Sequence, residues 1–251
     1  MEKQDSAEDI AAAVTAGFAP YDAAIQAWLD GDLAAAVEVL DTDGPSFTLP
    51  VATFARPVEE FDAVEAAALR EASGNVLDVG AGCGAFTIPI HRRGQRVVAI
   101  ETMPAAVRLL RQAGIPDIVD ESIWTWSTEE RFDTVLVMMN GTTMAGTPDR
   151  LGPFLYQLAS FLSPRGRILI DSTPVEGPDY DVAAGPEGEE ADEGLTVVEY
   201  RFQFGDLTGP PMPQLFASAS ALAEVARPLG FSGRILEETD SGHFLAQLKL
   251  R

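Results

Sequence analysis

The stretch GNVLDVGAGCGAF, residues 74–86, runs from a short apolar segment into a turn with three glycines and then into a second apolar segment. Gly80, Gly82 and Gly84 give the spacing G-x-G-x-G, while Gly80, Gly82 and Ala85 also satisfy G-x-G-x-x-G/A. Glycine lets the backbone pass close to a ligand, and a helix that starts after such a turn offers free N–H groups. The stretch therefore predicts a strand–turn–helix unit that binds a nucleotide-type cofactor, and it leaves the register of the motif open.

Two carboxylates near the turn bear on which cofactor it holds. Asp78 lies two residues before Gly80, where it can brace the amides of the turn or approach an ammonium group. It would repel a pyrophosphate, so it favours S-adenosylmethionine, whose methionine end carries an amino group, over a dinucleotide. Glu101 lies 21 residues after Gly80 and ends the run RVVAIE. A carboxylate there can accept hydrogen bonds from both ribose hydroxyls of either cofactor.

Strand-like and helix-like segments alternate around this unit from residue 75 to residue 172. The strand-like runs, such as FDTVLVMMN at 132–140, are continuously apolar, which is typical of strands covered on both faces. The fold class predicted is therefore α/β, with a doubly wound, Rossmann-like and mostly parallel sheet. The last segment, residues 232–250, predicts a C-terminal antiparallel strand.

The segments outside this core suggest further organisation. Residues 7–40 are rich in alanine and predict helices, so we expect a helical cap or extension over residues 1–70 and a core over 71–251. Residues 212–230 are also expected to be helical. A loop at about 173–194 is rich in Pro, Gly and acidic residues. Solvated disorder and a substrate lid are both compatible with that composition.

VLDVGAGCGAF and VVAIE, followed by FDTVLVMMN and LSPRGRILIDS, resemble the class I S-adenosylmethionine-dependent methyltransferases. Residues 49–57 and 138–155 also resemble stretches of a small bacterial subgroup of that family, for which the sequence assigns no substrate. The resemblance implies S-adenosyl-L-methionine as cofactor and methyl transfer as activity. One departure is that VDESIW, residues 119–124, has Ser122 where many members carry an adenine-binding Asp. The implied cofactor-binding residues are Asp78, Gly80, Ala81, Gly82, Gly84, Glu101, Thr102, Met103, Glu121, Ser122, Ile123 and Asn140.

The acceptor side of the predicted site is less defined. Methyl transfer from a sulfonium is an in-line displacement, and most of its catalysis can come from placing the acceptor atom. Asn140 and Gly141, after the fourth predicted strand, are expected to flank the methyl group, and Asn140 can orient a polar acceptor. His243 is a candidate general base, with a surface turn as the alternative, and Arg56 is a candidate cap residue. Trp124 and Trp126 are expected to serve in packing.

Composition narrows the partners. The net charge of −22 disfavours nucleic acids and anionic membranes, so a small-molecule acceptor is expected. Lysine occurs only as Lys3 and Lys249, a pattern that a high-salt cytoplasm or a GC-rich genome would each produce. One cysteine and two histidines predict neither a disulfide nor a metal site. The acidic N-terminus predicts a cytoplasmic protein. The alternatives left open are an NAD-dependent oxidoreductase and a non-catalytic S-adenosylmethionine-binding protein. The sequence sets no expectation for the oligomeric state.

Overall fold

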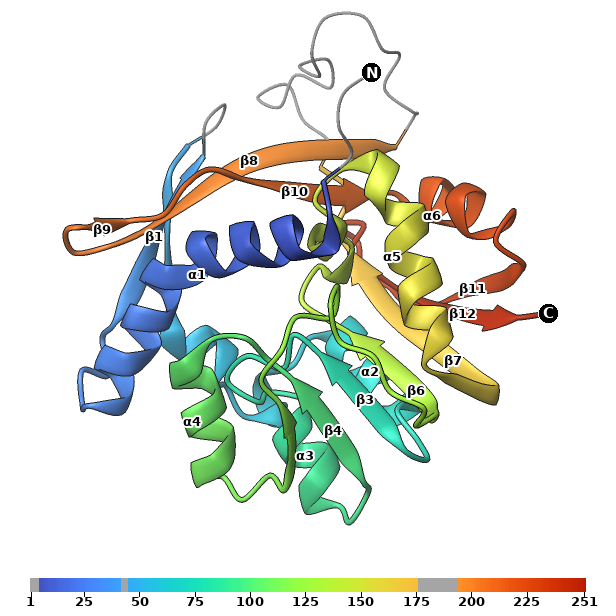
Figure 1. Cartoon of the computed structure of the whole chain (residues 1–251), viewed down its shortest axis with the longest axis horizontal. Coiled ribbons are helices and arrows are strands. Elements are labelled where there is room, and N and C mark those ends of the chain that lie inside the picture. The colour runs from blue at the N-terminus through green and yellow to red at the C-terminus, as the bar shows by residue number, and fades with distance from the viewer. Residues whose placement is uncertain (1–4, 42–44, 176–193) are drawn as a thin grey trace, which may run out of the picture.

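Seven strands form the larger of two sheets in the computed structural model, which describes residues 5–41, 45–175 and 194–251 (Figure 1). Neighbouring strands from β7 to β5 pair in parallel, while β12 pairs antiparallel with both β7 and β11. This confirms the predicted mostly parallel sheet with an antiparallel C-terminal strand. In spatial order the strands are β11 (Phe231–Glu238), β12 (Phe244–Leu250), β7 (Leu162–Ser172), β6 (Phe132–Val137), β3 (Val76–Val79), β4 (Val97–Ile100) and β5 (Asp117–Val119).

The chain order creates a crevice at the centre of this sheet. From β3 the chain proceeds outward through β4 to β5, and it then returns to form β6 and β7 on the other side of β3. Ligands of doubly wound sheets bind at such a switch point, outside the carboxyl ends of the strands. The glycine-rich turn follows β3 and therefore lies at the switch point.

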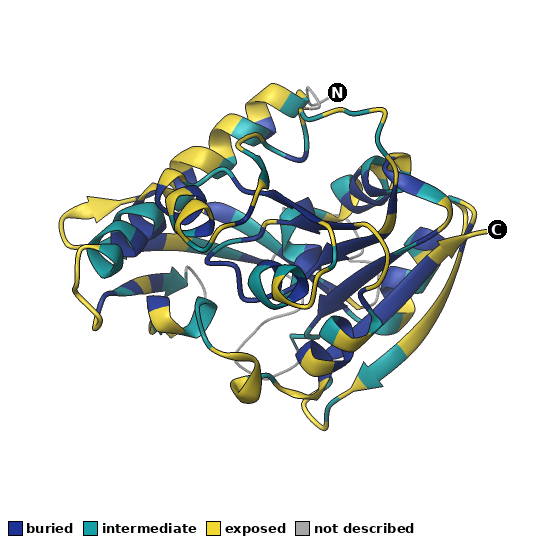
Figure 2. Cartoon of the chain, turned by 90° about the horizontal axis from the view of Figure 1, so that it is seen from below, coloured by how far each residue is buried: buried dark blue, intermediate teal, exposed yellow. Residues whose placement is uncertain are grey.

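Helices cover both faces of the seven-stranded sheet, as its continuously apolar strands require. α2 (Ala63–Glu71), α3 (Thr87–Arg92) and α4 (Pro104–Gln112) lie on one face, where α2 and α3 pack against Leu136 and Leu169, and α4 packs against Ala99. α5 (Pro148–Ser160) and α6 (Ala219–Ala226) lie on the other face and pack against Val135 and Ile168. Figure 2 shows buried residues concentrated along the strands between these layers.

A second, entirely antiparallel sheet lies across one end of the molecule (Figure 1). Its strands in spatial order are β10 (Met212–Ala217), β8 (Leu195–Phe204), β1 (Ala36–Asp41) and β2 (Phe47–Pro50), with β9 (Leu207–Thr208) paired to β8. The long helix α1 (Ala7–Leu29) packs against both β8 and α4. It begins at a capping box formed by Ser6 and Asp9. The second sheet and α1 together form a cap over the switch point.

The structure corrects the expected helical character and boundary of residues 1–70. Helix α1 ends at Leu29, and residues 36–41 form β1 because Val37 and Val39 point into a buried core while Ala36 and Glu38 do not. Residues 212–217, expected to be helical, form β10, and the helix starts only at Ala219. β8 pairs with β1, and β10 pairs with β8, although β8 and β10 come from residues expected in the core. The cap is therefore built from both the N-terminal and the C-terminal parts of the chain.

Two further expectations concern the acidic loop and membrane association. Of the acidic loop expected at about 173–194, residues 176–193 lie outside the described part of the chain. Over the described ranges, no helix combines the length and the apolar character that crossing a bilayer requires.

Candidate active site

A cavity of about 900 Å³ opens at the carboxyl ends of β3, β4 and β6 and continues beneath the second sheet. On one side it is lined by the glycine-rich turn and by Glu101, and on the other by Phe202 and Met212. This volume lies at the upper end of the range for small-molecule sites in proteins. The cavity is therefore large enough for a nucleoside cofactor together with a second small ligand.

The backbone of the glycine-rich turn shows which register of the motif operates. Gly80, Gly82 and Gly84 have φ angles of +73°, +52° and +85°, a conformation in which a side chain is strained, whereas Ala85 does not share it. The N–H groups of Gly80 and Ala81 both donate to the carbonyl of Ile100, each at 3.0 Å, which fixes the turn against the end of β4. The G-x-G-x-G reading is thus the one that the backbone uses.

Asp78 occupies a buried position on β3, with 3% of its surface exposed, and it lines the cavity. It accepts a hydrogen bond from the Thr87 hydroxyl of α3, which sequence reasoning did not single out. Burial raises the pKa of Asp78 to about 6, an effect that the bond from Thr87 opposes and the nearby Glu101 carboxylate reinforces. The N–H groups of Gly80 and Ala81 go to Ile100 and that of Gly82 to Glu101. Asp78 instead accepts from the hydroxyl and the backbone of Thr87, at the start of α3.

Glu101 is the residue that ties the glycine-rich turn to the segment after β4. Its Oε2 accepts the N–H of Gly82 at 2.7 Å, and its Oε1 accepts those of Thr102 at 2.7 Å and Met103 at 2.8 Å. Only 5% of Glu101 is exposed, and this burial raises its pKa despite the three hydrogen bonds. A carboxylate has about four acceptor positions, so one position on Oε2 stays available for a ligand hydroxyl.

The segment predicted to contact adenine borders the same cavity. Met103, Glu121, Ser122 and Ile123 all line it, and Ile123 is 2% exposed. The Ser122 hydroxyl accepts the N–H of Trp124 at 3.3 Å. Trp124 packs on Phe154, as expected, but it also lines the cavity, which the sequence did not indicate.

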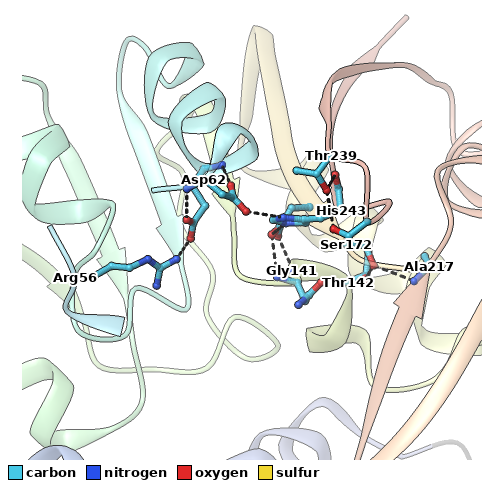
Figure 3. Close-up of polar contacts among 12 residues, drawn as sticks. Arg56, Asp62, Gly141, Thr142, Ser172, Ala217, Thr239 and His243 are labelled. Atoms are coloured by element: carbon cyan, nitrogen blue, oxygen red, sulfur yellow. Dashed lines mark hydrogen bonds and ion pairs between the residues drawn. The ribbon is translucent and has the colours of Figure 1, made fainter. Parts of the chain in front are cut away.

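His243 lies between two carboxylates at the wall of the cavity rather than in a free surface turn (Figure 3). Its Nε2 is 2.9 Å from Oδ2 of Asp171, and its Nδ1 is 3.0 Å from Oδ2 of Asp62. Burial opposes the charged form of His243, but the hydrogen bonds and charges of Asp171 and Asp62 outweigh burial and raise its pKa. A carboxylate at each ring nitrogen favours the charged imidazolium, a form that has no lone pair for general-base work.

Asp171 connects His243 to the turn that carries Asn140. Its side chain is fully buried, and its two oxygens accept the N–H groups of Asn140 at 3.0 Å and Gly141 at 2.8 Å (Figure 3). Met139 and Asn140 have φ angles of +68° and +60°, a left-handed conformation that is uncommon for residues other than glycine and that Asn adopts more readily than Met. The Asp171 carboxylate therefore fixes an unusual backbone turn.

Asn140 lines the cavity, and its Oδ1 is buried without a hydrogen-bond partner among the described residues. Gly141, predicted to flank the methyl group beside Asn140, instead packs against the ends of two strands. A Cβ at Gly141 would come within 2.9 Å of Val137 and 3.2 Å of Ile170. Of the two residues predicted in this turn, Asn140 lines the cavity and Gly141 does not.

Arg56 also lines the cavity, as the cap prediction requires, but its charge is already neutralised. Its guanidinium forms an ion pair with Glu65 and donates to the carbonyl of Thr53. The guanidinium also lies 5.6 Å from the centre of the Phe61 ring. Asp62, Glu65 and Asp171 were not predicted as site residues. The sequence signal for Asp62 and Glu65 was the capping box D-x-x-E at the start of α2.

The doubly wound sheet, the glycine-rich turn at its switch point and the acidic residue after the next strand define an α/β enzyme that binds a nucleoside cofactor. Comparisons with known proteins narrow this class. Residues 76–166 match the family described as a methyltransferase domain. This match supports the class that the motifs predict, the class I S-adenosylmethionine-dependent methyltransferases, with residues 76–166 as the methyltransferase domain.

Solved structures share this fold. A methyltransferase from Bacteroides fragilis, crystallised with S-adenosyl-L-homocysteine, is 27% identical with a TM-score of 0.81, over 94% of this chain and 96% of that one. A 1,6-didemethyltoxoflavin-N1-methyltransferase from Burkholderia thailandensis is 19% identical with a TM-score of 0.55, over 100% and 93% of the two chains. The CcbJ methyltransferase of Streptomyces caelestis is 16% identical with a TM-score of 0.53, over 74% and 94%. A search of curated protein sequences gave no significant match.

Proposed function

We propose that the protein transfers a methyl group from S-adenosyl-L-methionine to a small-molecule acceptor that binds beneath the second sheet. The observation that carries this proposal is the continuous cavity, which joins the Glu101-anchored glycine turn to the space under the cap. The similar protein from Bacteroides fragilis, crystallised with the product form of this cofactor, supports the choice of cofactor over NAD.

The residues on the cofactor side fit a nucleoside with an amino-acid tail. The remaining acceptor position on Glu101 suits one ribose hydroxyl, where the sequence had suggested two. Asp78 places a buried carboxylate near the turn that would receive the amino group. Tyr21 of α1 also lines the cavity, and its hydroxyl is buried without a partner among the described residues. A polar group of the cofactor would satisfy it.

The cofactor supplies an activated methyl group on a sulfonium, so the chain has to position the acceptor rather than activate the donor. Asn140 does this in our proposal, because its free Oδ1 can accept a hydrogen bond from an N–H or O–H of the acceptor. Asp171 holds Asn140 through the backbone, and His243 holds Asp171. His243 is thus a positioning residue in this proposal and not the base.

Binding of S-adenosylhomocysteine and of NAD, each measured by calorimetry, tests the cofactor. We expect S-adenosylhomocysteine to bind and NAD not to bind. Tight NAD binding without a response to S-adenosylhomocysteine would refute the proposal.

The variant Glu101→Gln tests the role of the ribose-binding residue. It should weaken S-adenosylhomocysteine binding by about 1.5–3 kcal/mol, or roughly tenfold to a hundredfold, because a charge-assisted hydrogen bond is lost. Glu60→Gln, at an exposed position in the 3-10 turn before α2, is the matched control. Unchanged affinity in Glu101→Gln would show that the ribose lies elsewhere.

A further inference from the structure

The part of the cavity beneath the second sheet is walled by aromatic rings from three different elements. Phe18 and Tyr21 of α1, Phe54 after β2, and Phe202 of β8 all line it, and we call them the aromatic compartment. The ring centres of Phe18 and Phe202 lie 5.1 Å apart, and those of Tyr21 and Phe54 lie 5.2 Å apart. Such a set of rings offers π faces to a flat, apolar ligand or to a cation.

The charges around the cavity are distributed unevenly. Among the described residues that line it, the cationic side chains are Arg56, Arg150 and His243. Each of these already binds a carboxylate that lines the same cavity, so none is left to pair with a ligand anion. The partners are Glu65 for Arg56, Asp5 for Arg150, and Asp62 and Asp171 for His243.

Further carboxylates make the wall of the cavity negative beyond these pairs. Asp9, Asp78, Glu101 and Glu121 also line it. A carboxylate or phosphate on the second ligand, placed beneath the second sheet, would lose its hydration there and would find no free cation, which is unfavourable. A neutral or cationic ligand meets no such cost.

The Asn140 side chain also favours a ligand that is not an anion. The Oδ1 of Asn140 is a neutral acceptor, buried and without a partner among the described residues. It suits an N–H or O–H group and would repel a lone pair or an anionic oxygen. The aromatic walls, the lack of a free cation and the acceptor atom of Asn140 therefore all favour a flat, neutral or cationic ligand with a hydrogen-bond donor.

We propose that the methyl acceptor is a flat, ring-containing, neutral or cationic molecule that presents an N–H or O–H group, and that acceptors bearing a carboxylate or phosphate are excluded. This inference rests on the proposed function, since it concerns the second ligand of the same cavity. The ion pair between Arg56 and Glu65 determines this specificity. Arg56 lines the cavity and could otherwise bind an anionic acceptor, but Glu65 already neutralises its charge.

Three probes that share the indole ring and differ in charge test the proposal. They are tryptamine, which is cationic, indole-3-acetamide, which is neutral, and indole-3-acetate, which is anionic. Each is titrated into protein already saturated with S-adenosylhomocysteine, so a failure of cofactor binding is seen separately in the first titration. We expect the acetate to bind at least about tenfold more weakly than the acetamide, and tryptamine to bind at least as well as the acetamide. Acetate binding equal to or tighter than that of the acetamide, or no binding of any of the three probes, would overturn the proposal.

The variant Glu65→Gln tests the specificity contact by a gain of binding. Glutamine keeps the capping box at the start of α2 but leaves the Arg56 guanidinium without its counter-charge. We expect indole-3-acetate to bind about tenfold more tightly to this variant, with little change for indole-3-acetamide. Glu60→Gln, which changes the same charge at an exposed site nearby, should change neither probe. An unchanged preference for the neutral probe in Glu65→Gln would contradict the role assigned to the ion pair.

Discussion

Replacing His243 with Gln tests whether this residue is the cation that the geometry implies. In the native protein its Nε2 bonds to Asp171, whose side chain is fully buried, and its Nδ1 bonds to Asp62, whose side chain is 44% exposed. A charge-assisted bond to a buried carboxylate stabilises by about 1.5–3 kcal/mol, whereas an exposed ion pair contributes about 0–1 kcal/mol. We therefore expect His243→Gln to lower the free energy of unfolding by about 1.5–4 kcal/mol at about pH 6.

The cost of this substitution should depend on pH in a direction set by the raised pKa of His243. A group whose pKa is higher in the folded state stabilises the fold fully below its unfolded pKa of about 6.5, and this contribution disappears as the pH rises through the folded pKa. By about pH 9 to 10 the cost of His243→Gln should fall toward the value for neutral hydrogen bonds, about 1 kcal/mol.

Urea denaturation of both proteins at the two pH values, followed by circular dichroism, measures this difference. His91→Gln, in the last turn of α3, is the matched control. An equal cost of His243→Gln at low and high pH would refute the assignment of a charged His243. The base role would then be open again.

Three further substitutions probe the cap. Tyr21→Phe removes a buried hydroxyl without a partner among the described residues, so the ligand-free protein should be unchanged or up to about 1 kcal/mol more stable in urea, while its thermal shift with S-adenosylhomocysteine should shrink. Gly17→Ala places a Cβ 1.7 Å from the Met212 sulfur and should cost about 1–3 kcal/mol, with partial rescue by Met212→Ala in the double variant. Asp22→Ala removes the 2.7 Å acceptor of the Ala105 N–H at the start of α4 and should cost about 1 kcal/mol, measured by urea denaturation.

The larger sheet could be predicted from the sequence because each of its strands has a recognisable local pattern of apolar residues. The residues of β3 and β4 are all buried, and all of them except Asp78 are apolar. Strands of this kind need helices on both faces, so the parallel α/β core follows from local patterns alone. The three glycines at positive φ likewise mark the turn without knowledge of the fold.

The second sheet could not be predicted in this way, because its pairing joins distant parts of the chain. Residues 33–40, LAAAVEVL, have the composition of a helix, but residues 38–41 pair with Tyr200 to Gln203 of β8 and so form a strand. Pairing and burial outweigh the helix propensity of alanine here. The alternation of Val37, Glu38 and Val39 was the available signal.

Contacts between distant parts of the chain also explain why the partners of His243 were not predicted. Glu101 could be predicted because its distance from the glycine-rich turn along the chain is fixed by one strand–helix–strand unit. The partners of His243 lie 181 and 72 residues away from it in the sequence, so no local pattern connects them. His243 was therefore predicted to be either a base or a surface residue, while in the structure it links Asp62 to Asp171.

Thr142 connects the turn that carries Asn140 to both sheets. Its buried hydroxyl donates to the carbonyl of Leu215 in β10 at 2.9 Å and lies 2.7 Å from the Ser172 hydroxyl at the end of β7 (Figure 3). The turn that carries Asn140 is thus fixed by the second sheet through Thr142 and by the larger sheet through Asp171. The glycine-rich turn is instead fixed by Ile100 and Glu101. Because the two turns have separate supports, changes in the second sheet should alter acceptor binding while leaving cofactor affinity unchanged.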